Sequence, residues 1–295
     1  MDLHKNETKY KKDAKYVSET IGCVLLLSML LFLWLKPHIQ PSAEASAKIL
    51  LFQICGKFCM FAVPAAWGVW MIRRSRIVFP REMRATSLHK TQTAVLSSFA
   101  LIVLLQMLYT AVFPDVQIVA DVEGMETPAQ ILLLFWSACF IPAFAEEILF
   151  RGFMIRSLRL FRKSLTVLMS AIAFALMHFS VTGFPLFFVC GLILGMVYLS
   201  TGSLSASIAV HFLCNAFWFL AKTVEVYLPE YSVTVTKGAF AICVLLCVTG
   251  IPFLKDNIRI FLEDQDENFM PSARFWTLPT ILFVLIAIGI QLFFQ

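Results

Sequence analysis

Nine long apolar stretches dominate this sequence and restrict the chain to folds that span a lipid bilayer. A helix needs about 20 apolar residues to cross the hydrocarbon core, because each residue advances it by about 1.5 Å. Only 15% of the residues are charged and the mean hydropathy is +0.80, whereas roughly a quarter of the residues in a soluble domain are charged. We therefore predict an all-α, polytopic transmembrane bundle of about nine helices, eight at the fewest, near residues 18–35, 48–72, 94–113, 129–156, 164–181, 184–200, 204–221, 237–254 and 275–294.

Charged residues between the apolar stretches indicate how the chain is oriented. Lysine and arginine are dense in residues 1–16, in the 73–90 loop and after the fourth stretch, whereas residues 114–128 contain four acidic residues and no lysine or arginine. Loops rich in lysine and arginine stay in the cytoplasm, so we predict a cytoplasmic N-terminus and an outside C-terminus. The first stretch lacks the cleavage site of a signal peptide, and we expect it to be retained as a helix.

Polar residues inside the apolar stretches are few, and they carry the functional signal. Charged side chains are costly within a bilayer and therefore tend to mark function. The relevant residues lie in the fourth, fifth and seventh stretches and are Glu146, Glu147, Arg151, His178, His211 and Asn215. We find little else of this kind in the nine stretches.

Helical spacing separates the two glutamates. Glu147 and Arg151 are four residues apart, so they share a helix face and can form an ion pair. Glu146 points about 100° away from Glu147 and lacks this partner. Pro142 lies one turn before Glu146 and is expected to bend the helix, because it removes a backbone hydrogen bond. By themselves, Glu147 and Arg151 are equally well explained as a structural pair.

The unpaired glutamate and the histidines favour hydrolysis of an amide bond. Glu146 with His178 can activate a water molecule by general-base catalysis. His211 and Asn215 lie one turn apart and can donate hydrogen bonds to an oxyanion. This mechanism needs no serine or cysteine nucleophile.

A zinc site is the alternative use of the same residues. Glu146, His178 and His211 can supply three ligands and leave a fourth position open for water. The HExxH motif of many zinc proteases is absent, and histidines on separate helices give no local spacing that indicates zinc. We favour the metal-free mechanism and keep zinc as a possible cofactor.

Three motifs together resemble a known family. EExxxR, FxxxH and HxxxN occur in this order on separate predicted helices, at residues 146–151, 174–178 and 211–215. The combination resembles the CAAX prenyl protease and bacteriocin-processing family, also described as type II CAAX endopeptidase-like or abortive-infection-like proteins. The resemblance covers about residues 94–254 and implies an intramembrane glutamate-type endopeptidase with an all-helical core.

The resemblance also implies a role for each motif residue. The roles form three pairs, which are Glu146 with His178 for activating water, His211 with Asn215 for stabilising the oxyanion, and Glu147 with Arg151 for supporting the site. The first two helices and the last one lie outside the resemblance, which says nothing of their role. Members of the family are often described as metalloproteases.

These observations predict the organisation and setting of the chain. We divide it into a two-helix membrane segment with a basic cytoplasmic loop (1–93), a catalytic helical core (94–254), and a cytoplasmic connection with a C-terminal membrane helix (255–295). We expect a multi-pass plasma-membrane protein of bacterial type. Its partners would be the lipid bilayer and a membrane-associated peptide or protein tail, and no basic stripe indicates nucleic-acid binding.

Several functions stay open at this stage. The peptidase could serve CAAX-type processing, maturation of a bacteriocin or another peptide, or immunity against one. A non-catalytic membrane scaffold or regulator is the main alternative, although it has no need of Glu146 and both histidines. An ion-coupled transporter also uses intramembrane carboxylates and imidazoles, but it would want a continuous polar path or broken helices.

Overall fold

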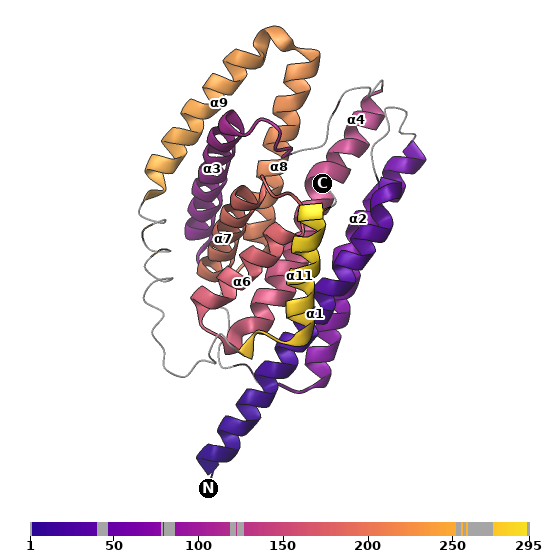
Figure 1. Ribbon diagram of the computed structural model, residues 1–295. Helices are drawn as coiled ribbons and strands as arrows, with labels where there is room; N and C mark the ends of the chain where they lie inside the picture. Colours follow the sequence, from indigo (N-terminus) through magenta and orange to yellow (C-terminus); the bar gives the residue numbers. More distant parts are fainter. Residues whose placement is uncertain are drawn as a thin grey trace.

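The computed structural model is an elongated helical bundle (Figure 1). It describes residues 2–39, 47–77, 79, 86–118, 122, 127–251, 255, 258 and 274–293. No β-strand occurs in these parts of the chain, and each of the nine predicted stretches contains a helix. The elements are α1 (Asp2–Ile39), α2 (Ala47–Arg74), α3 (Leu88–Val112), α4 (Pro128–Phe135), η1 (Trp136–Phe140), α5 (Ile141–Glu147), η2 (Ile148–Ile155), η3 (Leu158–Leu160), α6 (Lys163–Leu176), α7 (Phe184–Thr201), α8 (Leu204–Tyr227), α9 (Pro229–Thr249) and α11 (Leu278–Phe293).

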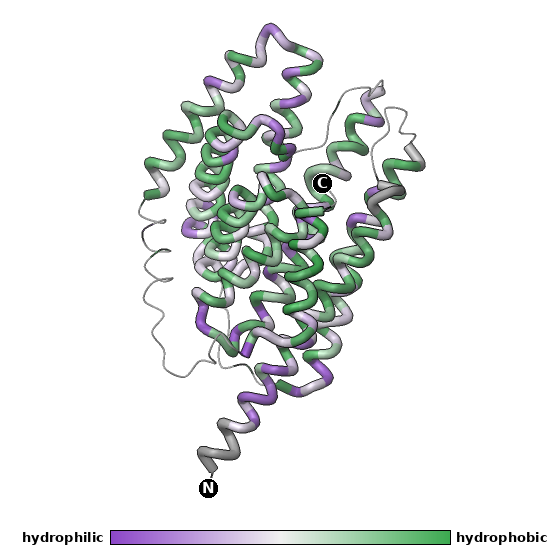
Figure 2. Tube along the Cα trace, in the orientation of Figure 1, coloured by the Kyte–Doolittle hydropathy of each residue, from purple (hydrophilic) through white to green (hydrophobic). Residues whose placement is uncertain are grey.

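The helices confirm the prediction of an all-α, multi-pass membrane protein. Among the described residues, seven helices are long and apolar enough to cross a bilayer, and α6 and α11 are shorter apolar helices. Apolar residues extend along the helices, while hydrophilic residues concentrate toward the two ends of the bundle (Figure 2). This distribution matches the low polarity of the hydrocarbon core between two polar interfaces.

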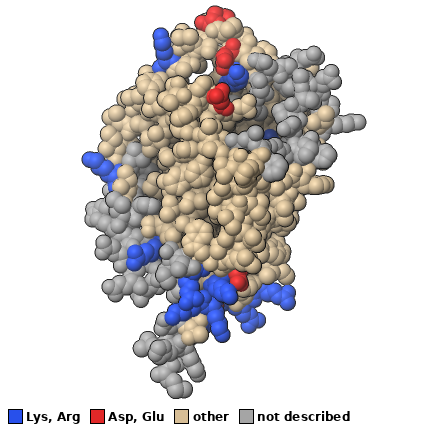
Figure 3. Space-filling view, viewed as in Figure 1, with Lys and Arg blue, Asp and Glu red and all other residues tan. Residues whose placement is uncertain are grey.

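Basic side chains gather at the end of the bundle where the N-terminus lies (Figure 3). Arg73 and Arg74 occupy the last turn of α2, which ends there. The positive-inside rule predicts that this end is cytoplasmic, and the orientation stays a prediction. Parts of the basic 73–90 loop, of the acidic 114–128 segment and of the 255–274 connection lie outside the described residues.

The fourth membrane helix is interrupted by wide π-helical turns on either side of α5. Ahead of Pro142, the N–H of Ile141 donates to the carbonyl of Trp136, five residues back. In this register the next donor would be Pro142, which has no N–H, so the carbonyl oxygen of Ser137 is left for another donor. The sequence-based expectation that Pro142 disturbs this helix agrees with the irregular turn before it.

The fifth membrane helix is shorter than predicted. α6 ends at Leu176 rather than at 181, because Phe179 adopts a left-handed backbone with φ 48° that no helix can continue through. The carbonyl of Leu176 accepts from the N–H of Phe179 at 3.2 Å and from the buried side chain of Gln291 on α11 at 3.1 Å. The last helix of the chain therefore fixes the segment that carries His178.

Two glycines let α6 and α7 pack closely. A Cβ atom added at Gly191 would lie 3.0 Å from the Cα of Ala171, and one at Gly195 would lie 3.0 Å from Cγ1 of Val167. Small residues are used in this way where membrane helices approach each other closely. The GxxxG sequence in the sixth stretch thus serves contact within the chain, as its spacing predicts.

We expect Gly191→Ala to lower the thermal stability of the protein in detergent. The new methyl group must displace the backbone of α6, and overpacking of this kind costs about 1–3 kcal/mol. Gly238→Ala is the matched control, because no atom lies within 4 Å of an added Cβ there. Equal unfolding temperatures for the two variants would show that the close approach of α6 and α7 does not support the fold.

Candidate functional site

Four of the six predicted site residues line one cavity. The cavity has a volume of about 590 Å³ and lies between residues of α1, α2, α3, α5, α6, α7 and α8. Its lining includes Glu146, His178, His211 and Asn215. Three segments that are distant in the sequence therefore meet around one space inside the membrane-spanning bundle, as the motif analysis predicts.

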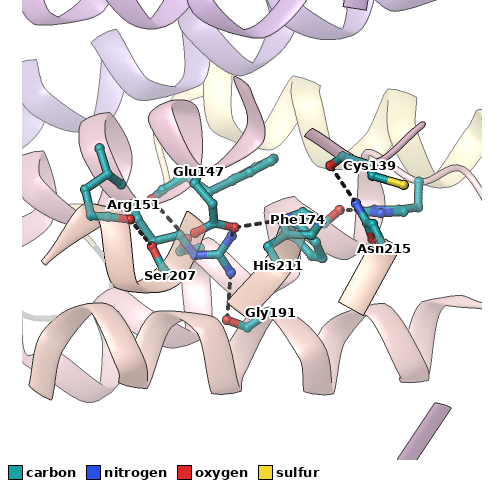
Figure 4. A network of polar contacts seen from close by, with 12 residues as sticks. Cys139, Glu147, Arg151, Phe174, Gly191, Ser207, His211 and Asn215 are labelled. Carbon is teal, nitrogen blue, oxygen red and sulfur yellow. Dashed lines mark hydrogen bonds and ion pairs between the residues drawn. The ribbon is translucent and has the colours of Figure 1, made fainter. Parts of the chain in front are cut away.

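The other two predicted residues lie behind the cavity wall. Glu147 and Arg151 have no exposed surface, and the Arg151 guanidinium donates to Glu147 Oε1 at 2.7 Å. This contact confirms the predicted ion pair. The same carboxylate oxygen also lies 3.0 Å from Nδ1 of His211 on α8 (Figure 4), a link that the sequence did not suggest.

Arg151 also ties the fourth helix to α7 and to the FxxxH motif. Its Nη2 donates to the carbonyl of Gly191 at 2.9 Å. Its guanidinium lies over the ring of Phe174, 4.9 Å from the ring centre, a cation–π contact. The same ring lies 4.7 Å from the ring of His178 and 5.8 Å from that of His211. Phe174 thus contacts the buried guanidinium and both imidazoles, while Arg151 and His211 also meet at Oε1 of Glu147.

Hydrogen bonds determine which nitrogen each histidine presents. Nδ1 of His178 lies 2.8 Å from the carbonyl of Phe174. A carbonyl only accepts, so this nitrogen carries the proton and Nε2 of a neutral ring is an acceptor. Nδ1 of His211 faces the carboxylate of Glu147 and donates in the same way. In their neutral forms both rings therefore have Nε2 as the remaining acceptor.

Glu146 is the carboxylate that the local packing leaves without a partner. Its Oε2 atom is buried and makes no hydrogen bond to any described residue. The side chain lines the cavity and interacts electrostatically with His211, Arg151 and Lys57. A buried carboxylate oxygen normally has a hydrogen-bond donor, so a water molecule or a substrate N–H is the natural partner here.

Asn215 completes the lining one turn beyond His211. Its Nδ2 atom lies 3.5 Å from the carbonyl of Cys139 in η1, the long limit of a hydrogen bond. The second N–H of the carboxamide is not engaged by this contact. Asn215 can therefore offer a donor to a group inside the cavity.

The suggested zinc ligands, Glu146, His178 and His211, line the same cavity. No set of three or more His, Cys, Asp or Glu side chains in the described chain is arranged to hold a metal ion. Nδ1 of each histidine faces a protein acceptor and leaves Nε2 available, which is the arrangement that metal-binding histidines usually have. Zinc binding therefore stays a prediction that this structure does not test.

The sequence reading missed a charged residue of the cavity, Lys57. It is the only charged residue between positions 49 and 72, and it lines the cavity from α2. The statement that little else of this kind occurs in the apolar stretches was therefore wrong. The signal was available, because a lysine in the middle of an apolar run follows the same rule that selected Glu146.

Residues outside the three motifs contribute to the cavity as well. Phe32 of α1 lines it and stacks on Phe179, with ring centres 4.9 Å apart. Gln106 of α3 lines it and accepts from the indole N–H of Trp218 at 2.8 Å. These contacts involve no charge and follow no motif, so no pattern in the sequence identifies them.

Comparison with known families supports the motif analysis. Residues 128–217 match the family described as type II CAAX prenyl endopeptidase Rce1-like. The matched segment contains all three motifs and lies within the predicted 94–254 core, so the resemblance inferred from the motifs is confirmed for it. No curated protein and no solved structure matches the chain.

We expect loss of either partner of the buried Glu147–Arg151 pair to destabilise the protein strongly. Glu147→Gln or Arg151→Met leaves an uncompensated buried charge, which costs about 3–5 kcal/mol. The double variant should lose less than the sum of the two, because it removes both charges. Thermal unfolding of the four proteins in a double-mutant cycle measures this coupling.

The exposed pair Lys15–Glu19 on α1 is the matched control for this cycle. It has the same four-residue spacing, but its side chains are 65% and 43% exposed and 3.7 Å apart. Exposed pairs contribute only about 0–1 kcal/mol. Equally small coupling at both pairs would contradict a structural role for Glu147 and Arg151.

Proposed function

We propose that this chain is an intramembrane endopeptidase that hydrolyses a peptide bond of a membrane-associated peptide or protein tail. The observation that carries the proposal is the free carboxylate of Glu146 facing a cavity shared with two imidazoles and a carboxamide. A purely structural bundle gains nothing from an unpaired carboxylate in its interior, since burial without a partner costs free energy. The endopeptidase description of the matching family supports the same reading.

The proposed reaction begins with a water molecule held between Glu146 and Nε2 of His178. Glu146 takes a proton from this water as the oxygen attacks the carbonyl carbon of the substrate. A carbon–oxygen bond forms, and the carbonyl becomes a tetrahedral oxyanion. Glu146 then gives its proton to the amide nitrogen as the carbon–nitrogen bond breaks, which releases an amine and a carboxylic acid.

The oxyanion requires donors on the other wall of the cavity. Asn215 supplies an N–H directly. His211 donates through Nε2 only when both of its nitrogens carry protons, because Nδ1 already donates to Glu147. The carboxylate of Glu147 would position this ring from behind the cavity wall without touching the substrate.

The position of the site supports a proposal for the substrate. A cavity among apolar helices is suited to a segment anchored in the bilayer, so we propose CAAX-type processing, maturation of a bacteriocin or signalling peptide, or immunity against such a peptide. The proposed location is a bacterial plasma membrane with the N-terminus in the cytoplasm. A non-catalytic regulator is the alternative that the cleavage experiment decides.

We expect Glu146→Gln to abolish cleavage while the protein stays folded. The amide has nearly the shape of the carboxylate but cannot accept the proton from water. Membrane peptides from cells with the wild-type protein, with this variant and without the protein are compared by proteomics of new termini. Termini that appear only with the wild type identify substrates, and the purified protein is then tested on the corresponding synthetic peptide.

The same comparison distinguishes an enzyme from a regulator. Thermal unfolding and elution on size exclusion verify that Glu146→Gln is folded. Lys237→Met is the control for a single substitution in an exposed part of a spanning helix. Cleavage by Glu146→Gln at the wild-type rate, or identical termini in all samples, would rule out the mechanism and favour the regulator.

We expect reporter fusions in a bacterial host to give opposite results at the two ends of the chain. A fluorescent protein that folds only in the cytoplasm should be fluorescent at the N-terminus, and alkaline phosphatase should be active at the C-terminus. The physical reason is the basic end of the bundle, which the positive-inside rule retains in the cytoplasm. Phosphatase activity at the N-terminus would contradict the orientation.

A further inference from the structure

Lys57 lines the cavity that also contains Glu146, and the two charges interact electrostatically. Its ammonium donates to the carbonyl and the hydroxyl of Ser137, at 3.1 and 3.2 Å. Ser137 lies nine residues before Glu146 on the fourth helix, a separation of about 14 Å along the axis. Ala138 and Pro142 line the cavity between the two positions, so the space extends along this face of the helix from one charge to the other.

Backbone geometry explains the first contact of Lys57 but not its charge. Pro142 leaves the Ser137 carbonyl without its helical donor, and Lys57 fills that vacancy. Any neutral donor would do the same at lower cost, because an ammonium loses far more hydration free energy on burial than an amide does. The positive charge therefore calls for an acidic partner, and Glu146 supplies only an electrostatic interaction across the cavity, without a hydrogen bond.

No acidic side chain neutralises this ammonium by direct contact. Lys57 takes part in none of the ion pairs formed among the described residues. The cavity lining contains one carboxylate, Glu146, and one cation, Lys57, within the described chain. An ammonium has three N–H groups, so after its two contacts with Ser137 a donor is left for another acceptor.

We propose that Lys57 binds a carboxylate of the peptide substrate at the end of the cavity away from Glu146, an inference that rests on the proposed function. An extended peptide covers about 3.3 Å per residue, so a carboxylate held at Lys57 would lie a few residues along the peptide from a bond placed at Glu146. The carboxylate is either the C-terminal group of the peptide or an acidic side chain near that position. Lys57 is thus a residue that selects the substrate and sets the register of cleavage.

Binding is tested with three synthetic peptides on the full chain carrying Glu146→Gln, in which no turnover occurs. Each probe is an N-palmitoylated, fluorophore-labelled hexapeptide of alanine and leucine. The first ends in a free carboxylate, the second in a carboxamide, and the third in a carboxamide with glutamate near its end. Fluorescence anisotropy in detergent micelles gives the Kd of each.

We expect at least one carboxylate peptide to bind about tenfold or more tightly than the neutral amide, as a charge-assisted hydrogen bond predicts. Lys57→Met should remove this difference, and Lys57→Arg should keep part of it. Whether the first or the third peptide gains affinity identifies the source of the carboxylate. Equal Kd values for all three peptides, or no binding of either carboxylate peptide, would overturn the proposal. These results would be obtained with Lys57 unchanged and would need no variant at that position.

Two further variants separate substrate binding from a structural role. Ser137→Ala retains the carbonyl and the ammonium and should keep the preference for a carboxylate, while Lys237→Met, an exposed lysine of α9, should change nothing. If Lys57→Met weakens all three peptides equally, Lys57 serves packing or Glu146 and the proposal is wrong.

Failure of the proposed function would be seen separately. The protein with Glu146 unchanged is also tested for cleavage of the three peptides and of any peptide that proteomics identifies. If it cuts none of them but Lys57 still gives a preference for a carboxylate, the binding role of Lys57 is kept and the peptidase is rejected. If the protein cuts a peptide but binds the carboxylate and carboxamide peptides with equal Kd values, the peptidase is kept and the binding role of Lys57 is rejected.

Discussion

The buried carboxylate of Glu147 is the interaction on which the arrangement of the site depends. One of its oxygens lies within 2.7 Å of Arg151 and 3.0 Å of His211, and Arg151 in turn binds the Gly191 carbonyl of α7. The fourth helix, α7 and α8 are therefore connected through one charge that has no access to solvent. Within the described residues, Oε2 of Glu147 and Nε of Arg151 have no hydrogen-bond partner, so the network depends on the two contacts of Oε1. These contacts fix where His211 enters the cavity.

The same network makes the two adjacent glutamates different in kind. Each glutamate has a buried Oε2 atom without a hydrogen-bond partner among the described residues. Glu147, however, points to the packed side of its helix and pairs there with Arg151 through Oε1, whereas Glu146 lines the cavity and forms no such ion pair. The difference arises from about 100° of helical rotation between neighbouring residues. A chain can thus place a structural and a reactive carboxylate at adjacent positions, because the helix face from which each side chain projects determines its surroundings.

Much of this could be predicted from the sequence, for identifiable reasons. The lengths of the apolar stretches predict the helices, and the four-residue spacing predicts the Glu147–Arg151 ion pair. The contact of Glu147 with His211 joins residues 64 positions apart, and helical spacing carries no information about it. The early end of α6 depends on one left-handed residue, Phe179, and on Gln291, 115 positions from its acceptor Leu176. Lys57 is a different case, since its charge was visible and only its importance was overlooked.

Irregular backbone connects these observations. Where the fourth helix widens before Pro142, carbonyl oxygens of η1 face outward from the regular ladder, and two of them accept from other helices, that of Ser137 from Lys57 and that of Cys139 from Asn215. A straight α-helix would use those acceptors internally. The proline therefore does more than disturb the helix, because it leaves the Ser137 carbonyl for a side chain from α2. The Cys139 carbonyl of the same widened turn lies beside a side chain from α8. The two ends of the cavity can then differ in charge while both are anchored to a single helix.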